Sequence, residues 1–280
     1  MIADYLILSY HRHMNDFLLK KVYVEIGNIC NLHCNFCAND LREKSTMSIE
    51  NFEIVAEKVK KVSEHIYLHV LGEPLLHPQF EKILQICKNK NLKVNLVTNG
   101  TLIEKNSAII LNSDCVRKVA FSLHSFEANL CGNKGLGLEK YVEIVSEFVK
   151  LASNKGIVCE LRFWNNSSKC NSLNDEITKK LEKVLTLPNV FVGKGDKFDW
   201  RTKGETRCKK CMGCRDQLGV LVDGTVVPCC IDFGGEIRLG NIFNDSFETI
   251  LSSNKAQAIA EGFKKNVAVE NFCMSCGFHA

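Results

Sequence analysis

Apolar runs and amphipathic stretches alternate along the chain from residue 21 to about residue 195. Six short runs rich in β-branched and aromatic residues predict strands at 21–27, 65–73, 92–100, 116–125, 156–164 and 189–192. Between them, apolar residues recur at helical spacing in 49–64, 77–90, 138–156 and 173–185. Apolar strands joined by helical crossovers are typical of parallel strands buried on both faces. The pattern therefore predicts an α/β fold, a partial (β/α)6 TIM-like barrel with its active site at the carboxyl ends of the strands.

The alternation stops near residue 195. The following stretch, up to Cys214, is polar and glycine-rich, so it predicts a linker and loop. Asp223-Gly224 then lies between two β-rich runs, a strong signal for a β-hairpin, and residues 246–263 have a helical pattern. The sequence thus predicts two domains: a barrel at 1–195 and a small cysteine-rich hairpin and helix extension at 196–280.

Composition and charge exclude several classes of partner. The chain has 280 residues, 45% of them hydrophobic, and a formal net charge of +4, which indicates neither a nucleic-acid-binding surface nor a membrane partner. The apolar run Tyr5–Tyr10 is too short to span a bilayer and predicts an amphipathic helix before the first strand. We therefore expect a cytoplasmic protein.

Cysteine usage points to metal binding. Of the 15 cysteines, ten fall in two zones, 30–37 and 208–276. The number is odd and no secretion signal is visible, so a disulfide framework is disfavoured. The scattered cysteines at 87, 115, 131, 159 and 170 are expected to be small buried side chains.

The first zone follows the spacing C-x3-C-x2-C, with Cys30, Cys34 and Cys37 directly after the first predicted strand. A loop can wrap three thiolates around one metal centre and leave its fourth position open. A structural zinc site needs a fourth ligand, and the nearest candidate, His33, would need strained geometry beside Cys34. An iron–sulfur cluster with three cysteine ligands and one free iron fits the spacing better.

With Phe36 before its last cysteine, this motif resembles that of the radical S-adenosylmethionine (SAM) superfamily. The resemblance implies a [4Fe-4S] cluster whose free iron chelates the amino and carboxylate groups of SAM. The segment "LGEPLLHP" (71–78) resembles the family's GGEP segment, with Leu71 in place of the first glycine. This implies that Glu73 contacts the methionine amino group of SAM.

Three later strand ends resemble segments that line the SAM pocket in this family. "VTNG" (97–100) and "FSLHS" (121–125) nominate Thr98, Asn99 and Ser122 for ribose or methionine contacts. Arg162 is a candidate partner for the SAM carboxylate, because a guanidinium binds a carboxylate in a fork. The alternatives are that Asn99-Gly100 is only a turn and that Ser122 is a satisfied strand hydroxyl.

The second cysteine zone resembles the SPASM and twitch extensions of radical SAM enzymes. The resemblance implies a second [4Fe-4S] cluster on Cys214, Cys229, Cys273 and Cys276, and the few residues after Cys276 suggest the shorter twitch type. A structural zinc site with four cysteine ligands is the alternative. Cys208, Cys211 and Cys230 do not fit the four-ligand count.

The resemblance also implies a reaction. In this superfamily a reduced cluster cleaves SAM to a 5′-deoxyadenosyl radical, which takes a hydrogen atom from a substrate. We therefore expect an external electron donor such as flavodoxin or ferredoxin. A second cluster could remove an electron from a substrate radical, or it could be structural.

The substrate is less well defined. Only 29 residues precede Cys30, too few for a domain that captures a leader peptide, which favours a small-molecule substrate. The layout resembles the 2-deoxy-scyllo-inosamine dehydrogenase type, which oxidises an alcohol, and the queuine lyase type, which cleaves a C–N bond. The alternatives are a peptide-modifying SPASM-type maturase and a non-catalytic metal-binding protein. Candidate substrate contacts are His69, His77, His124, Asn165 and Asp232.

Overall fold

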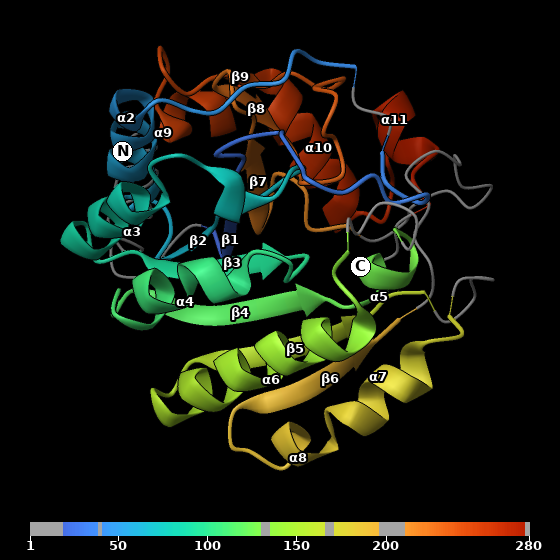
Figure 1. The fold of residues 1–280 in the computed structure, drawn as a ribbon. Helices are drawn as coiled ribbons and strands as arrows, with labels where there is room; N and C mark the ends of the chain where they lie inside the picture. Colours follow the sequence, from blue (N-terminus) through green and yellow to red (C-terminus); the bar gives the residue numbers. More distant parts are fainter. Residues whose placement is uncertain (1–18, 39–40, 130–134, 166–170, 196–210, 278–280) are drawn as a thin grey trace.

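Figure 1 shows the fold in a computed structural model, which describes residues 19–38, 41–129, 135–165, 171–195 and 211–277. A nine-stranded sheet runs in the order β6-β5-β4-β3-β2-β1-β7-β8-β9. Its first six strands pair in parallel. They are β1 (Lys21–Val24), β2 (His65–Tyr67), β3 (Lys93–Thr98), β4 (Val116–Ser122), β5 (Val158–Phe163) and β6 (Val190–Lys194). The expected α/β partial barrel is confirmed, and within the described residues it stays open between β6 and β9.

Helices connect these strands and cover one side of the sheet (Figure 1). The first, α2, begins after Ser48, whose hydroxyl accepts a hydrogen bond from the backbone N–H of Asn51. Its buried stripe includes Phe52, Val55 and Val59, as the spacing predicts. The others are η1 (Pro74–Leu76), α3 (Phe80–Asn89), α4 (Ile103–Leu111), α5 (His124–Glu127), α6 (Leu138–Asn154), α7 (Asn174–Lys180) and α8 (Glu182–Leu185), with α2 at Ile49–Val59.

The two faces of the sheet differ in polarity. Side chains that face the helices, such as Val119 and Phe121, are fully buried, and the Phe121 ring packs against Phe148 of α6. Alternate side chains lie on the opposite face because successive residues of a strand point to opposite sides. Many of these are polar and only half-buried. We call this face the inner wall: Tyr23, Tyr67, His69, Lys118, Ser122, Glu160, Arg162, Trp164 and Phe191.

The C-terminal region extends the same sheet. Strand β7 (Gln217–Val220) pairs in parallel with β1, from Lys21 with Gln217 to Val24 with Val220. It then forms an antiparallel hairpin with β8 (Thr225–Val227), and β9 (Gly240–Asn241) follows. The turn contains Gly224 at φ +82°, a conformation that favours glycine. The hairpin expected around Asp223-Gly224 is therefore confirmed.

The expectation of one helix over 246–263 is wrong. The chain forms α9 (Phe247–Leu251) and α10 (Asn254–Lys264), followed by α11 (Asn271–Met274). Ser253 adopts an extended conformation and its hydroxyl accepts a hydrogen bond from the N–H of Ala256, so it starts a new helix. The 173–185 pattern is likewise divided into α7 and α8, and α4 was not expected from the sequence.

The expected N-terminal helix and the expected domain boundary both remain predictions. The amphipathic helix before β1 falls in residues 1–18, and the domain boundary at 195/196 adjoins 196–210, all outside the described residues. In the described part of the chain, none of the helices has the length and apolar character needed to cross a membrane.

Lys58 ties α2 to the C-terminal region. Its ammonium donates hydrogen bonds to the carbonyls of Ile242, at 2.6 Å, and Asp245, at 2.9 Å. Lys58→Met removes both charged hydrogen bonds and should lower the free energy of unfolding by about 2 kcal/mol, as measured in urea. The control Lys61→Met, at an exposed position of the same helical end, should change it by less than about 0.5 kcal/mol. Equal effects of the two substitutions would contradict the assigned role of Lys58.

Candidate iron–sulfur and SAM site

The three N-terminal cysteines lie on a loop that leaves the end of β1. Cys30 and Cys37 are exposed and Cys34 is half-buried. The backbone N–H of Cys37 donates to the carbonyl of Cys34 at 3.0 Å, which closes a tight turn between the last two. We call the described residues of this stretch, 29–38 and 41, the cluster loop.

The base of the cluster loop is closed by backbone pairing. Gly27 forms an antiparallel bridge with Thr46, and the N–H of Met47 donates to the carbonyl of Ile26 at 2.9 Å. The Asn28 side chain adds hydrogen bonds to the carbonyl of Glu43 and from the N–H of Ser45. The loop is therefore anchored at both ends by contacts that involve none of its cysteines.

Side-chain amides reach the sulfur atoms. Asn129, just after α5, donates from Nδ2 to Cys34 Sγ at 2.8 Å, and its Oδ1 accepts from the N–H of His33 at 2.7 Å. Asn99 Nδ2 lies 3.9 Å from Cys30 Sγ. Burial raises the pKa of the Cys34 thiol to about 12, so ligation must remove its proton.

This donor set fits an iron–sulfur cluster. Three cysteine side chains lie on one short loop, and N–H groups directed at cysteine sulfur are a common way in which proteins set cluster potentials. His33 is exposed, and its backbone, not its ring, makes the contact to Asn129. Phe36 lies beside His124, with ring centroids 5.1 Å apart.

The Gly72-Glu73 loop packs directly on the cluster loop. The N–H of Glu73 donates to the carbonyl of Ile29 at 2.9 Å. A Cβ at position 72 would lie 2.4 Å from the carbonyl oxygen of Gly27, and φ is +78°. Only glycine fits there. The first glycine of the GGEP pattern is absent, but this second one is structurally required.

Glu73 itself is buried against β3. Its Oε1 accepts from Thr98 Oγ1 at 2.8 Å and from the N–H of Leu75, and its Oε2 accepts from the N–H of Asn99 at 2.8 Å. Burial raises its pKa to about 7, although these three donors act in the opposite direction. The structure thus brings together Glu73, Thr98 and Asn99, three of the residues nominated for SAM.

Asn99 is more than a turn residue. Its Nδ2 donates to Asn31 Oδ1 in the cluster loop, and its backbone carbonyl accepts from the fully buried Tyr141 hydroxyl at 2.8 Å. The other two nominated residues, Ser122 and Arg162, are direct partners in the β4–β5 register. The predicted SAM residues therefore lie at or just after the carboxyl ends of four neighbouring strands, β2 to β5.

The C-terminal cysteines gather around the β7–β8 hairpin and α11. Cys214 and Cys273 are buried in the main hydrophobic core, with Cys211 and Cys276 packed against it. The N–H of Cys214 lies 3.4 Å from the carbonyl of Pro228, next to Cys229. Burial raises the pKa of Cys214 to about 12, and the nearby Cys211 thiol adds to the shift. Cys211 therefore lies near Cys214, one of the four predicted ligands.

Cys230 and Cys208 are the other two cysteines that do not fit the four-ligand count. Cys230 is directed to the inner wall, where its thiol is hydrogen-bonded to the Tyr23 hydroxyl. Cys208 lies outside the described residues. Within the described ranges, no group of three His, Cys, Asp or Glu side chains is arranged to hold a single metal ion.

The proposed substrate contacts separate into three sets. His69 belongs to the inner wall and His124 lies beside it: His69 stacks edge-on against Tyr23, and His124 Nδ1 lies 3.1 Å from the carbonyl of Arg162. Asp232 accepts two backbone N–H groups of its own loop, and Asn165 pairs with Asn174. These last two contacts are structural.

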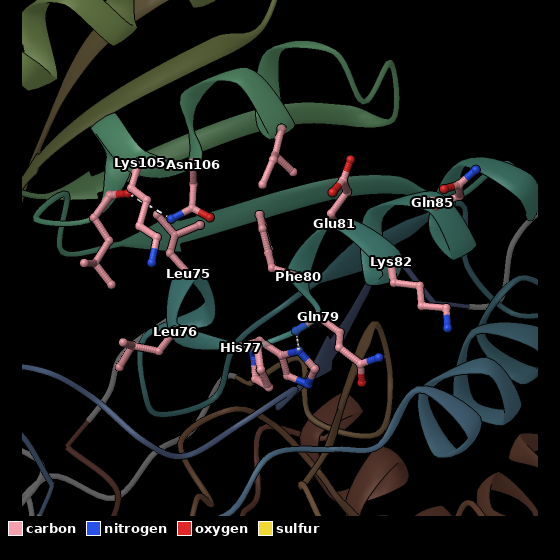
Figure 2. Close-up of a pocket in the computed structure, with 13 residues that line it drawn as sticks. Leu75, Leu76, His77, Gln79, Phe80, Glu81, Lys82, Gln85, Lys105 and Asn106 are labelled. Atoms are coloured by element: carbon pink, nitrogen blue, oxygen red, sulfur yellow. Dashed lines mark hydrogen bonds between the residues drawn. The ribbon is translucent and has the colours of Figure 1, made fainter.

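His77 lies elsewhere, in a pocket of about 550 Å³ between η1, α3 and α4 (Figure 2). Its Nε2 lies 2.9 Å from the carbonyl of Met47, and its Nδ1 accepts from the N–H of Gln79. Lys82, Lys105 and Asn106 also line this pocket. None of its lining residues belongs to the inner wall.

Sequence reasoning missed Asn129, Glu25 and Arg42. Asn129 is 95 positions from Cys34, and no spacing rule connects them. Glu25 could have been found from the sequence, because it is a carboxylate within the apolar run 21–27. In the structure it is fully buried. A buried charge needs a partner. Arg42 Nη1 and Nη2 bind its two oxygens, both at 2.8 Å.

The raised pKa of Glu73 predicts a pH dependence of stability. The unfolded carboxyl ionises near pH 4.5, whereas the folded one keeps its proton to about pH 7. Between these values the folded state binds more protons, so stability falls as pH rises, by about 3 kcal/mol. Glu73→Gln cannot ionise and should lack this slope in urea unfolding of the cluster-free chain. Parallel slopes in both proteins would show that another group is responsible.

Asn129 predicts a change in cluster binding. Asn129→Ala removes the donor to Cys34 Sγ and the acceptor for His33, so the reconstituted chain should hold less iron at the N-terminal site. Asn174→Ala, which removes a comparable amide pair away from the cysteines, is the control. Iron analysis after anaerobic reconstitution measures both. Full iron content in Asn129→Ala would exclude this role.

The chain matches two family models. Residues 24–162 match the radical SAM superfamily, and residues 208–277 match SPASM, an iron–sulfur cluster-binding domain. The first match spans β1 to β5 and the second spans the C-terminal cysteines from Cys208 to Cys276.

Relatives of several kinds are similar to this chain. The subtilosin biosynthesis protein AlbA of Bacillus subtilis is 26% identical over 269 residues, which cover 82% of this chain and 58% of AlbA. The S-adenosyl-L-methionine-dependent 2-deoxy-scyllo-inosamine dehydrogenase of Niallia circulans is 22% identical, over 93% of this chain and 94% of its own length. The first curated relatives are matched over only 25% to 58% of their lengths.

Solved structures share the fold. The structure of anSMEcpe with bound AdoMet and Cp18Cys peptide has a TM-score of 0.64 at 20% identity, covering 92% of this chain and 86% of that chain. Membership of the family implies a [4Fe-4S] cluster and SAM, and the SPASM match implies further iron–sulfur binding in place of zinc. The chain belongs to the radical SAM superfamily and carries a C-terminal SPASM iron–sulfur cluster-binding domain.

Proposed function

We propose that this protein removes a hydrogen atom from a small polar substrate bound at the inner wall, leading to alcohol dehydrogenation or C–N bond cleavage. When bound at Cys30, Cys34 and Cys37, the reduced cluster and SAM supply the radical chemistry. The chain's own residues bind SAM, hold the substrate and exclude water. The observation that carries the proposal is the polarity of the inner wall.

The charges of the inner wall lie on β4 and β5, next to the β6 edge of the sheet. Glu160 accepts from Lys118 Nζ at 2.6 Å and from Arg162 Nη2 at 2.8 Å. Burial acts to raise the pKa of Glu160, but the hydrogen bonds from Arg162 and Lys118 outweigh it and hold this pKa below its usual value. The group is therefore ionised. A Cβ on Gly193 would lie 2.6 Å from Glu160 Oε1, so the glycine makes room for the carboxylate.

Two aromatic rings flank these charges. The Arg162 guanidinium lies 4.7 Å from the centroid of Trp164, and Lys118 Nζ lies 5.2 Å from that of Phe191. Trp164 and Phe191 are 38% and 44% exposed. Exposed rings beside fixed charges suit a ligand that offers both a ring face and polar groups. This supports a cyclitol-like or nucleobase-like substrate.

The SAM contacts proposed from the sequence are compatible with this arrangement. Arg162 Nε is buried and has no hydrogen-bond partner among the described residues, and the residue pairs with Ser122 at the carboxyl end of β4. A carboxylate would satisfy that donor. We assign the SAM carboxylate to Arg162 and Ser122, and its amino group to the Glu73 loop with Thr98 and Asn99.

Peptide modification is the second candidate. The similarity to AlbA and the peptide-bound anSMEcpe structure both favour it. The dehydrogenase of Niallia circulans, in contrast, matches this chain over nearly all of both lengths. We weigh that near-equal coverage, together with the charged inner wall, in favour of the small substrate.

One anaerobic assay tests the proposal. The reconstituted chain with SAM and a reductant should form 5′-deoxyadenosine, and a true substrate should accelerate its formation. The panel contains 2-deoxy-scyllo-inosamine, a 7-deazapurine base and a short cysteine-containing peptide. Stimulation by the peptide alone would overturn the small-substrate proposal, and no 5′-deoxyadenosine from a fully loaded chain would overturn the enzymatic one.

Arg162 gives a residue-level test. Arg162→Lys keeps the charge but loses the fork, so it should raise the KM for SAM by about tenfold with a smaller change in kcat. Arg117→Lys is the matched control, since Arg117 is exposed at the opposite end of β4. An unchanged KM for SAM in Arg162→Lys would place the SAM carboxylate elsewhere.

A further inference from the structure

We propose that Glu25 is a positioning residue that sets the C-terminal iron–sulfur domain in register with the SAM-binding loops. It lies directly after β1 and is fully buried. It contacts neither the cysteines nor the inner wall through any hydrogen bond that the structure shows, so it acts through the segments that it holds. The inference rests on the family assignment and not on the proposed substrate.

Four donors surround the Glu25 carboxylate. Oε1 accepts from Arg42 Nη2 at 2.8 Å and from the N–H of Leu71 at 3.3 Å. Oε2 accepts from Arg42 Nη1 at 2.8 Å and from the N–H of Val222 at 3.1 Å. Each oxygen thus joins one guanidinium nitrogen to one backbone N–H.

The donors come from three separate segments. Arg42 directly follows the cluster loop, Leu71 precedes Gly72 and Glu73, and Val222 lies in the β7–β8 turn, on the chain that continues to Cys229. A displacement of any one segment would leave part of a buried carboxylate unpaired. Such a loss costs more than an exposed hydrogen bond. The three segments therefore hold one another in place through a single side chain.

Backbone contacts alone do not make this connection. The Glu73 N–H and Gly72 join the Glu73 loop to the cluster loop, and the β1–β7 pairing holds the hairpin strand. The tip of the hairpin at Val222 lies beyond Val220, the last residue of β7 that pairs with β1. Glu25 supplies the bond that fixes this tip relative to Leu71.

Hydrogen exchange of the reconstituted full chain tests the assignment. Glu25→Gln offers one acceptor oxygen in place of two and turns an N–H₂ group toward donors. Exchange should accelerate by about tenfold or more at Leu71 and Val222, and in the residues after the cluster loop, with α6 unchanged. Iron content should fall at both cysteine regions. Arg42→Lys keeps the carboxylate, so it should loosen the chain after the cluster loop and leave Val222 protected.

The control is Asp216→Asn, which breaks the exposed ion pair between Lys20 and Asp216 just before β1 and β7. It should change neither hydrogen exchange nor iron content. Equal exchange at Val222 in Glu25→Gln and wild type overturns the proposal, as does a uniform rise that includes α6. If Glu25→Gln does not fold, hydrogen exchange in the wild-type chain tests the proposal instead. Protection at Leu71 and Val222 should agree within about threefold, as in one cooperative unit, and a larger disparity contradicts it.

Discussion

A buried carboxylate with four donors is the contact on which the arrangement of the site depends. Removing an ionised carboxylate from water costs several kcal/mol unless good partners replace the water. Glu25 recovers this cost through Arg42 and two backbone N–H groups. Because those donors belong to three segments, the electrostatic requirement of one side chain becomes a geometric requirement on the segments that surround the cysteines.

The parallel sheet supplies the other half of the arrangement. Parallel strands end at the same edge, so loops that are far apart in the sequence meet there. In this chain the edge holds the cluster loop after β1, Glu73 after β2, Asn99 after β3 and Asn129 beyond β4. The same strands bury apolar side chains toward the helices and present Lys118, Glu160 and Arg162 on the other side. Apolar packing and charged side chains thus occupy opposite faces of the same strands.

Sequence reasoning recovered the features that depend on local pattern. The six parallel strands, the Asp223-Gly224 hairpin and the meeting of Glu73 with Thr98 and Asn99 all follow from periodicity, turn chemistry or a short motif. Two kinds of feature were missed: a local cap inside a continuous helical pattern, and contacts between distant parts of the chain. The break at Ser253 depends on a cap that competes with a continuous apolar pattern, and the parallel pairing of β7 with β1 joins residues from opposite ends of the chain. Asn129 and Arg42 have functions only because the fold places them beside Cys34 and Glu25.

The central claim is that two iron–sulfur centres with separate ligand sets occupy one continuous sheet. Iron and sulfide analysis of the reconstituted chain and of its Cys30/Cys34/Cys37→Ala triple variant tests this claim most directly. If both centres are [4Fe-4S], the parent holds about eight iron atoms and the variant about four, with matching sulfide. A variant that keeps all of its iron, or that retains zinc without iron, would contradict the account.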